Sequence, residues 1–136
     1  MLTEKKLNLP SEIESVEKAA SEAENFARES GLGDAELFAI DMAVRESVAN
    51  AVKHGNKFDD AKKVDVTFSN SESGFEITIR DYGKGFHVED IPDPTNPENL
   101  LKANGRGILF MNNFMDAVEW ENHIDGGMVV KMLKKH

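Results

Sequence analysis

The chain has 136 residues, no cysteine and a formal net charge of -9, with 40% hydrophobic and 30% charged residues. This composition is typical of one soluble globular domain. It excludes a disulfide framework and a thiolate metal site, and no apolar run is long enough to span a membrane. The acidic balance disfavours nucleic acid as the main partner, since phosphate binding requires a basic surface, and the missing cysteines fit the cytoplasm.

The N-terminal half predicts one strand and two helices. Alternating leucines indicate a short edge strand over residues 2–9. Ser11 and Glu14 have the spacing of a capping box, which predicts that the first helix begins there. Gly31 has the position of a helix-ending glycine, and a second helix is predicted over residues 34–54.

The C-terminal half predicts mainly strands. Apolar and polar residues alternate over 63–69 and again over 75–80, which indicates an antiparallel hairpin. A third helix is expected over 108–118, followed by two closing strands over 117–122 and 128–133. This order favours an α/β (α+β) fold, a two-layer sandwich with helices on one face of a mixed, mainly antiparallel sheet.

A polar stripe runs along the second predicted helix. In RESVANAVKHGN, Glu46, Asn50 and His54 follow at intervals of four, so they fall within one narrow arc beside the apolar stripe. A carboxylate such as Glu46 can accept a proton from an attacking hydroxyl, and the oxygen of Asn50 suits Mg²⁺. The alternative is a surface helix on which Glu46 makes an ion pair, Asn50 caps a neighbour and His54 interacts with the helix dipole.

Two glycine-rich segments follow predicted secondary structure. In DYGKGF, Asp81 could accept a hydrogen bond from an exocyclic amine, and Gly83 and Gly85 would let the backbone approach a flat ring. In NGRG, residues 104–107, backbone amides at a helix start and the charge of Arg106 would favour phosphate. Each segment alone is also explained by a plain turn or a flexible helix entry, and neither a Walker motif nor a GxGxxG fingerprint is present.

Taken together and in this order, these features are far more specific. The segments AVRESVANAVKHGN, ITIRDYGKGF, DPTNPENLL and NGRGILFMNNFMDAVEW resemble the N, G1 and G2 boxes of the Bergerat-fold ATPases. More narrowly, the chain is similar to the small bacterial anti-sigma factor serine kinases from Leu7 to Lys134. The resemblance implies one histidine-kinase-like domain over residues 1–136 that uses ATP and Mg²⁺. The proline-rich segment 87–104 is expected to be a mobile lid rather than a linker.

The resemblance also implies roles for individual residues. Glu46 matches the family's catalytic carboxylate, and Asn50 matches its magnesium-coordinating asparagine. Lys53 and His54 occupy positions that lie near the phosphates in relatives, and Asp81 matches the aspartate that receives the adenine amino group. The remaining matches belong to two glycine-rich turns, one beside the base and one around the phosphates: Gly83, Gly85, Gly105, Arg106 and Gly107.

The function implied is a regulatory serine/threonine protein kinase that phosphorylates an anti-sigma factor antagonist and sequesters a sigma factor. A homodimer is a further expectation. Relatives usually place a Gly-Thr pair in the last hairpin, where this chain has Gly127-Met128, so a thioether replaces a hydroxyl that helps hold adenine. One missing hydrogen bond is worth about 1 kcal/mol. This departure keeps open an alternative, a non-catalytic protein-interaction module with weak or no ATP binding.

Overall fold

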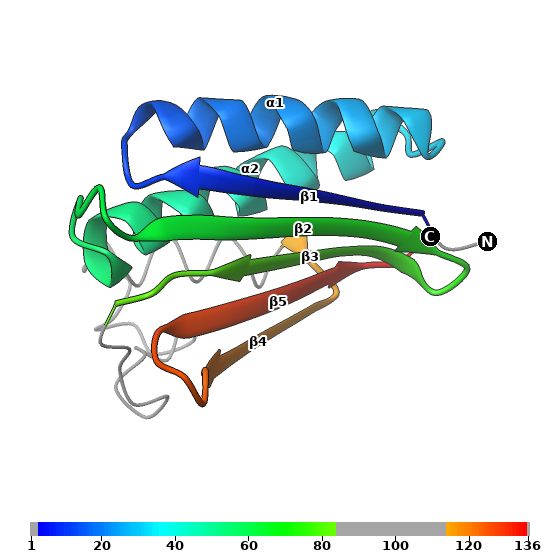
Figure 1. Cartoon of the computed structure of the whole chain (residues 1–136). Coiled ribbons are helices and arrows are strands. Elements are labelled where there is room, and N and C mark those ends of the chain that lie inside the picture. Colours follow the sequence, from blue (N-terminus) through cyan, green and yellow to red (C-terminus); the bar gives the residue numbers. More distant parts are fainter. Residues whose placement is uncertain (1–2, 84–113, 136) are drawn as a thin grey trace, which may run out of the picture.

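The computed structural model describes residues 3–83 and 114–135, in which two long helices cover one face of a five-stranded sheet (Figure 1). The third helix predicted over 108–118 lies mostly outside the described residues, and its last two residues belong to a strand. No helix of the described part is long and apolar enough to cross a membrane. In chain order the elements are β1 (Thr3–Pro10), α1 (Glu14–Glu29), α2 (Asp34–Asn50), the π-helical turn η1 (Ala51–Gly55), β2 (Lys63–Ser71), β3 (Gly74–Arg80), β4 (Ala117–Asn122) and β5 (Met128–Lys134).

The strands form one sheet in the order β1-β2-β3-β5-β4, and all four pairings are antiparallel. This confirms the predicted edge strand, the predicted hairpin and the two closing strands. A mixed, mainly antiparallel sheet was expected. The described strands form an antiparallel sheet and include no parallel pair. Because β3 pairs with β5 rather than with β4, the end of β3 and the start of β5 lie side by side, with Arg80 opposite Val129.

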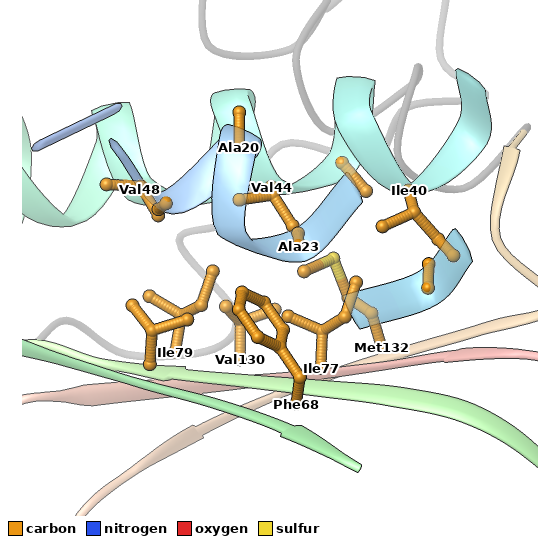
Figure 2. Packing of buried hydrophobic residues seen from close by; sticks show 14 of the residues in the cluster. Ala20, Ala23, Ile40, Val44, Val48, Phe68, Ile77, Ile79, Val130 and Met132 are labelled. Carbon is orange, nitrogen blue, oxygen red and sulfur yellow. The ribbon is translucent and has the colours of Figure 1, made fainter. Parts of the chain in front are cut away.

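The core lies between the helices and the sheet. Alternate residues of β2, β3 and β5 point towards the helices, and the apolar stripe of α2 packs onto them (Figure 2). Each such side chain contributes about 1.5–3 kcal/mol by leaving water. Fully buried alanines on α1, among them Ala20 and Ala23, let α2 pack closely beside it on the same face of the sheet. The labelled core residues are Ala20, Ala23, Ile40, Val44, Val48, Phe68, Ile77, Ile79, Val130 and Met132.

The two ends of α1 differ in how well the sequence predicted them. Gly31 ends the helix as predicted: its φ is +89°, and the N–H of Leu32 donates to Ala27 O at 3.1 Å. The capping box at the start is wrong, since the helix begins at Glu14 without a side-chain cap. The hydroxyl of Ser11 instead donates to the carbonyl of Lys62, at the entrance of β2.

The second helix continues as far as predicted but changes geometry in its last turn. Residues 51–55 form a π-helical turn, closed where the N–H of Asn56 donates to Ala51 O at 2.8 Å. The prediction of a regular helix over 34–54 is therefore wrong for this turn. A π-turn fits one extra residue into the helix and is common at functional sites. It lies at the end of the sheet where β3 finishes and β5 begins (Figure 1).

Candidate functional site

Asp81 follows directly after β3 and is almost completely buried, with 5% of its surface exposed. Its Oδ1 accepts hydrogen bonds from the N–H groups of Gly83, at 3.0 Å, and Met128, at 3.1 Å. Its own N–H donates to Met128 O at 3.0 Å. Burial raises the pKa of the Asp81 carboxyl, and the two amide donors oppose that rise. The carboxyl group is thus oriented through one oxygen, Oδ1.

Three glycines pack closely at Asp81 and its neighbours, and each is required by a close approach to a side chain or to backbone. A Cβ on Gly55 would overlap the Asp81 carboxyl and lie 2.9 Å from Asp81 Cβ. A Cβ on Gly83 would lie 2.6 Å from the carbonyl carbon of Gly55, and one on Gly127 2.8 Å from that of Asp81. Real Cβ atoms essentially never approach within 3.0 Å. The end of η1, the turn after β3 and the start of β5 therefore meet at Asp81.

Glu46 and Asn50 lie one turn apart near the end of α2, and both are half-buried. Neither side chain has a hydrogen bond or an ion pair with another described residue. Lys53 and His54 lie on η1 and are exposed. Since η1 continues α2 and ends at Gly55, the element that carries these four predicted positions runs directly to the Asp81 carboxyl.

The arginine next to Glu46 is engaged elsewhere. Arg45 pairs with Glu17 of α1 at 2.6 Å and with Asp41 one turn earlier at 3.0 Å. This pairing raises the pKa of Arg45 and lowers that of Glu17. Arg45 thus holds α1 against α2 and leaves the Glu46 carboxylate without a cationic partner among the described side chains.

The turn that carries Asp81 is also held on the face of the sheet away from the helices. The hydroxyl of Tyr82 donates to Asp65 of β2, which also accepts from Asn8 of β1 at 2.6 Å. The guanidinium carbon of Arg80 lies 4.3 Å from the centre of the Tyr82 ring, a cation–π distance. Arg80 further donates to Gly126 O at 3.4 Å.

Sequence reasoning missed Asn56, which is 1% exposed. Its Oδ1 accepts from the N–H of Tyr82 at 2.8 Å, and its Nδ2 donates to Ser11 Oγ at 2.9 Å and to Lys63 O at 3.0 Å. The available signal was an amide residue directly after the glycine that ends the second helix. The partners of its side chain lie 6 to 45 residues away along the chain, so no local pattern could identify them.

Met128 takes part in the site through its main chain, which pairs with Asp81 in both directions. Its side chain is 3% exposed and shares the helix-facing side of β5 with Val130 and Met132. The departure from the Gly-Thr pattern therefore changes a side chain and keeps the two main-chain bonds.

The other predicted positions lie outside the described residues, namely Gly85, Gly105, Arg106, Gly107 and the expected lid over 87–104.

Comparison with known proteins identifies the family. Residues 9–134 match the histidine kinase-like ATPase domain. The chain belongs to this family. Members similar to it include the anti-sigma F factor of Anoxybacillus flavithermus, 36% identical over 103 residues, which are 73% of this chain and 69% of that one. The serine-protein kinase RsbW of Bacillus licheniformis is 35% identical over 101 residues, 70% of this chain and 62% of that one.

A solved structure supports the same fold. The RsbU and RsbW domains of a Mycobacterium tuberculosis protein superpose with a TM-score of 0.66 over 98% of this chain, at 14% identity. The chain spans 32% of that structure. At this identity the likeness shows the fold alone, and it confirms that the family's sheet-and-helix arrangement is the one described above.

Proposed function

We propose that this chain is an ATP- and Mg²⁺-dependent serine/threonine protein kinase that acts as an anti-sigma factor. Its protein substrate is an anti-sigma factor antagonist, and its second partner is a sigma factor that it sequesters in the cytoplasm by direct binding. The relatives named anti-sigma F factor and serine-protein kinase support this proposal. So does the match to an ATPase domain over residues 9–134.

The observation that carries the proposal is the orientation of Asp81. Its Oδ1 is taken by two backbone amides, so Oδ2 is the oxygen left to accept a hydrogen bond from a ligand. Gly55 has no side chain to cover that oxygen. Adenine presents an amino donor at the position where guanine presents a carbonyl, so a carboxylate acceptor favours ATP over GTP.

In this proposal, residues of α2 bind the phosphate end of the ligand. Asn50 offers a neutral oxygen, which suits Mg²⁺, an ion that prefers oxygen ligands and retains phosphates and waters in its shell. No group of three or more acidic or histidine side chains in the described part of the chain could hold a metal by itself. Asn50 would hold the ion together with the ATP phosphates, and the ion would neutralise charge at the transferred phosphoryl group.

Glu46 is positioned one turn before Asn50 to act as the general base. The hydroxyl oxygen of the partner's serine or threonine bonds to the γ-phosphorus, and Glu46 accepts the hydroxyl proton. The bond between the γ-phosphorus and the bridging oxygen breaks, and ADP leaves with that electron pair. The half-buried Glu46 carboxylate has no described cation beside it, because Arg45 is engaged with Glu17.

A phosphate-transfer assay tests the proposal. Wild type, Glu46→Ala and Asn50→Ala are incubated with labelled ATP and a panel of anti-sigma factor antagonists from the same genome. Glu46→Ala should bind ATP and lose about 10²- to 10⁴-fold in transfer rate, while Asn50→Ala should also bind Mg²⁺–ATP more weakly. Glu76→Ala, on the outer face of β3, is the matched control and should transfer normally. Transfer at full rate by Glu46→Ala would remove that residue from the mechanism.

The second candidate function is a protein-interaction module without catalysis. The buried thioether at Met128, in place of the usual hydroxyl, favours it because adenine then loses one partner. If the chain is such a module, wild type, Glu46→Ala and Asn50→Ala should all bind the partner equally well in a pull-down. It would transfer no phosphate to any antagonist, which is the result that separates it from the kinase.

A further inference from the structure

Asn56 joins four separate parts of the chain through one buried residue. Its main-chain N–H closes η1 on Ala51 O at 2.8 Å. Its side-chain amide donates to Ser11 Oγ before α1 and to Lys63 O at the start of β2, and accepts from the N–H of Tyr82 after β3. A primary amide is costly to bury unless its donors and its acceptor are satisfied, and here both kinds are.

The chain path on either side of Asn56 is closely constrained. Lys57 and Phe58 follow with φ of +51° and +59°, a left-handed conformation that residues other than glycine rarely adopt. The N–H of Phe58 donates to Val52 O at 2.9 Å and holds this reversal against η1. Such backbone persists only where the surroundings determine it. Asn56, which comes directly before this reversal, is buried.

The bond to Tyr82 places Asn56 next to the ligand-facing carboxyl group. Tyr82 lies between Asp81 and Gly83, and the N–H of Gly83 orients the Asp81 carboxyl. A shift of the Tyr82 amide would therefore move the carboxyl and one of its donors together. On the other side, Asn56 directly follows Gly55, the residue whose backbone packs against Asp81 and Gly83.

We infer that Asn56 is a positioning residue that fixes the Asp81 turn relative to the helix carrying Glu46 and Asn50, and so determines the preference for adenine. It acts through the N–H of Tyr82 and touches no ligand itself. This inference rests on the proposed function for the identity of the ligand. It goes beyond that function by assigning base selectivity to a residue outside the three sequence boxes.

The test compares Asn56→Ala with Ser11→Ala. Ser11→Ala removes one partner of the Asn56 amide and leaves the bond to Tyr82 in place. Mg²⁺–ATP and Mg²⁺–GTP affinities are measured for both variants and for wild type. Asn56→Ala should lose about tenfold in ATP affinity, the cost of one misplaced hydrogen bond. GTP affinity should hardly change, so the ratio of ATP affinity to GTP affinity should also fall about tenfold. Ser11→Ala should keep the wild-type ratio even where its stability is lower.

Amide hydrogen exchange without nucleotide gives a second readout. Exchange at Tyr82 should accelerate in Asn56→Ala, while amides in the β2–β3 ladder, such as Ile77, keep their protection. If Asn56→Ala does not fold, Asn56→Ser replaces it, since a single hydroxyl cannot reach both Lys63 O and the Tyr82 N–H. An unchanged ATP:GTP ratio and unchanged Tyr82 exchange would overturn the positioning role alone. A wild-type protein that binds neither nucleotide would overturn the proposed function, and the selectivity role with it.

Discussion

Gly55 approaches Asp81 so closely that a Cβ added to the glycine would overlap the carboxyl group of the aspartate. The two residues belong to segments that the sheet does not connect, since Gly55 ends η1 and Asp81 follows β3. Their contact brings the helix with Glu46 and Asn50 against the turn that would read the base. The glycine thus has a packing role in addition to ending the helix.

Gly55→Ala should therefore lower the free energy of unfolding by about 1–3 kcal/mol, the usual cost of overpacking a filled space. The substitution should also weaken ATP binding, because the Asp81 carboxyl must move to make room for the methyl group. Urea unfolding and nucleotide titration measure the two effects. Gly33→Ala is the matched control: its φ is −86°, and the nearest atom to the added methyl is the flexible Glu36 side chain at 3.1 Å. Equal behaviour of the two variants would contradict the packing role.

Asp81→Asn should remove most of the stabilisation that ATP gives. A ligand at a hundredfold excess over its dissociation constant stabilises a fold by about 2.7 kcal/mol. The asparagine can keep its amide oxygen as the acceptor for the N–H groups of Gly83 and Met128. Its NH₂ group, a donor, would then face the amino group of adenine, which is also a donor. Thermal unfolding with and without Mg²⁺–ATP checks this, with Asp60→Asn at an exposed position as control. A wild-type protein that ATP does not stabilise would count against the whole site.

The same substitution should have an effect that depends on pH. Burial raises the pKa of Asp81 in the folded chain above its ordinary value of 3.8, so the folded state holds this proton more tightly than the unfolded state. Ionised Asp81 therefore costs stability at neutral pH, and the cost is relieved as pH falls through the raised pKa towards 3.8. Asparagine carries no charge at any pH. Asp81→Asn should gain most over wild type at about pH 7 and least at about pH 4, measured by chemical denaturation. A constant difference would mean that the pKa is not raised.

Met128→Thr should increase the affinity for ATP and lower the free energy of unfolding. The hydroxyl restores a hydrogen-bonding group at the position where relatives have one, which is worth about fivefold in affinity. The buried thioether is lost, and the cost is about 2 kcal/mol or more of unfolding free energy. Met132→Thr, at an equally buried position two residues along β5, should lose stability without gaining affinity. Calorimetric titration and urea unfolding separate the two quantities.

The regular elements were predictable because their causes are local. Alternating apolar residues gave β2 and β3, and both closing strands begin where they were predicted to begin. Gly31 ended α1 for a reason contained in a few neighbouring residues. The errors have distant causes. Ser11 has the spacing of a cap, yet its hydroxyl donates to Lys62, which lies 51 residues later. The π-turn is closed by the main-chain N–H of Asn56, whose side chain bonds to the start of β2 and to the turn after β3.

The candidate site divides in the same way. Glu46, Asn50 and Asp81 stood out because each carries a chemical group in a recognisable setting, and their roles remain predictions. Asn56 did not stand out, and Gly127 was noted only as the glycine of the family's Gly-Thr pair, because what both residues do depends on backbone that approaches from elsewhere. A glycine with φ of +89° beside the Asp81 carbonyl is visible only once β5 has been placed next to β3.

The pairing of Asp81 with Met128 spans 47 residues and links a middle strand to the last strand described. During synthesis, Glu46, Asn50 and Asp81 all leave the ribosome before Met128 does. Until β5 pairs with β3, the Asp81 carboxyl lacks one of its two amide donors and Gly127 is not in place beside it. A chain cut short before Met128 would therefore carry these three residues without an oriented acceptor. β5 is therefore needed to orient this acceptor, and a chain that lacks β5 should bind the ligand poorly.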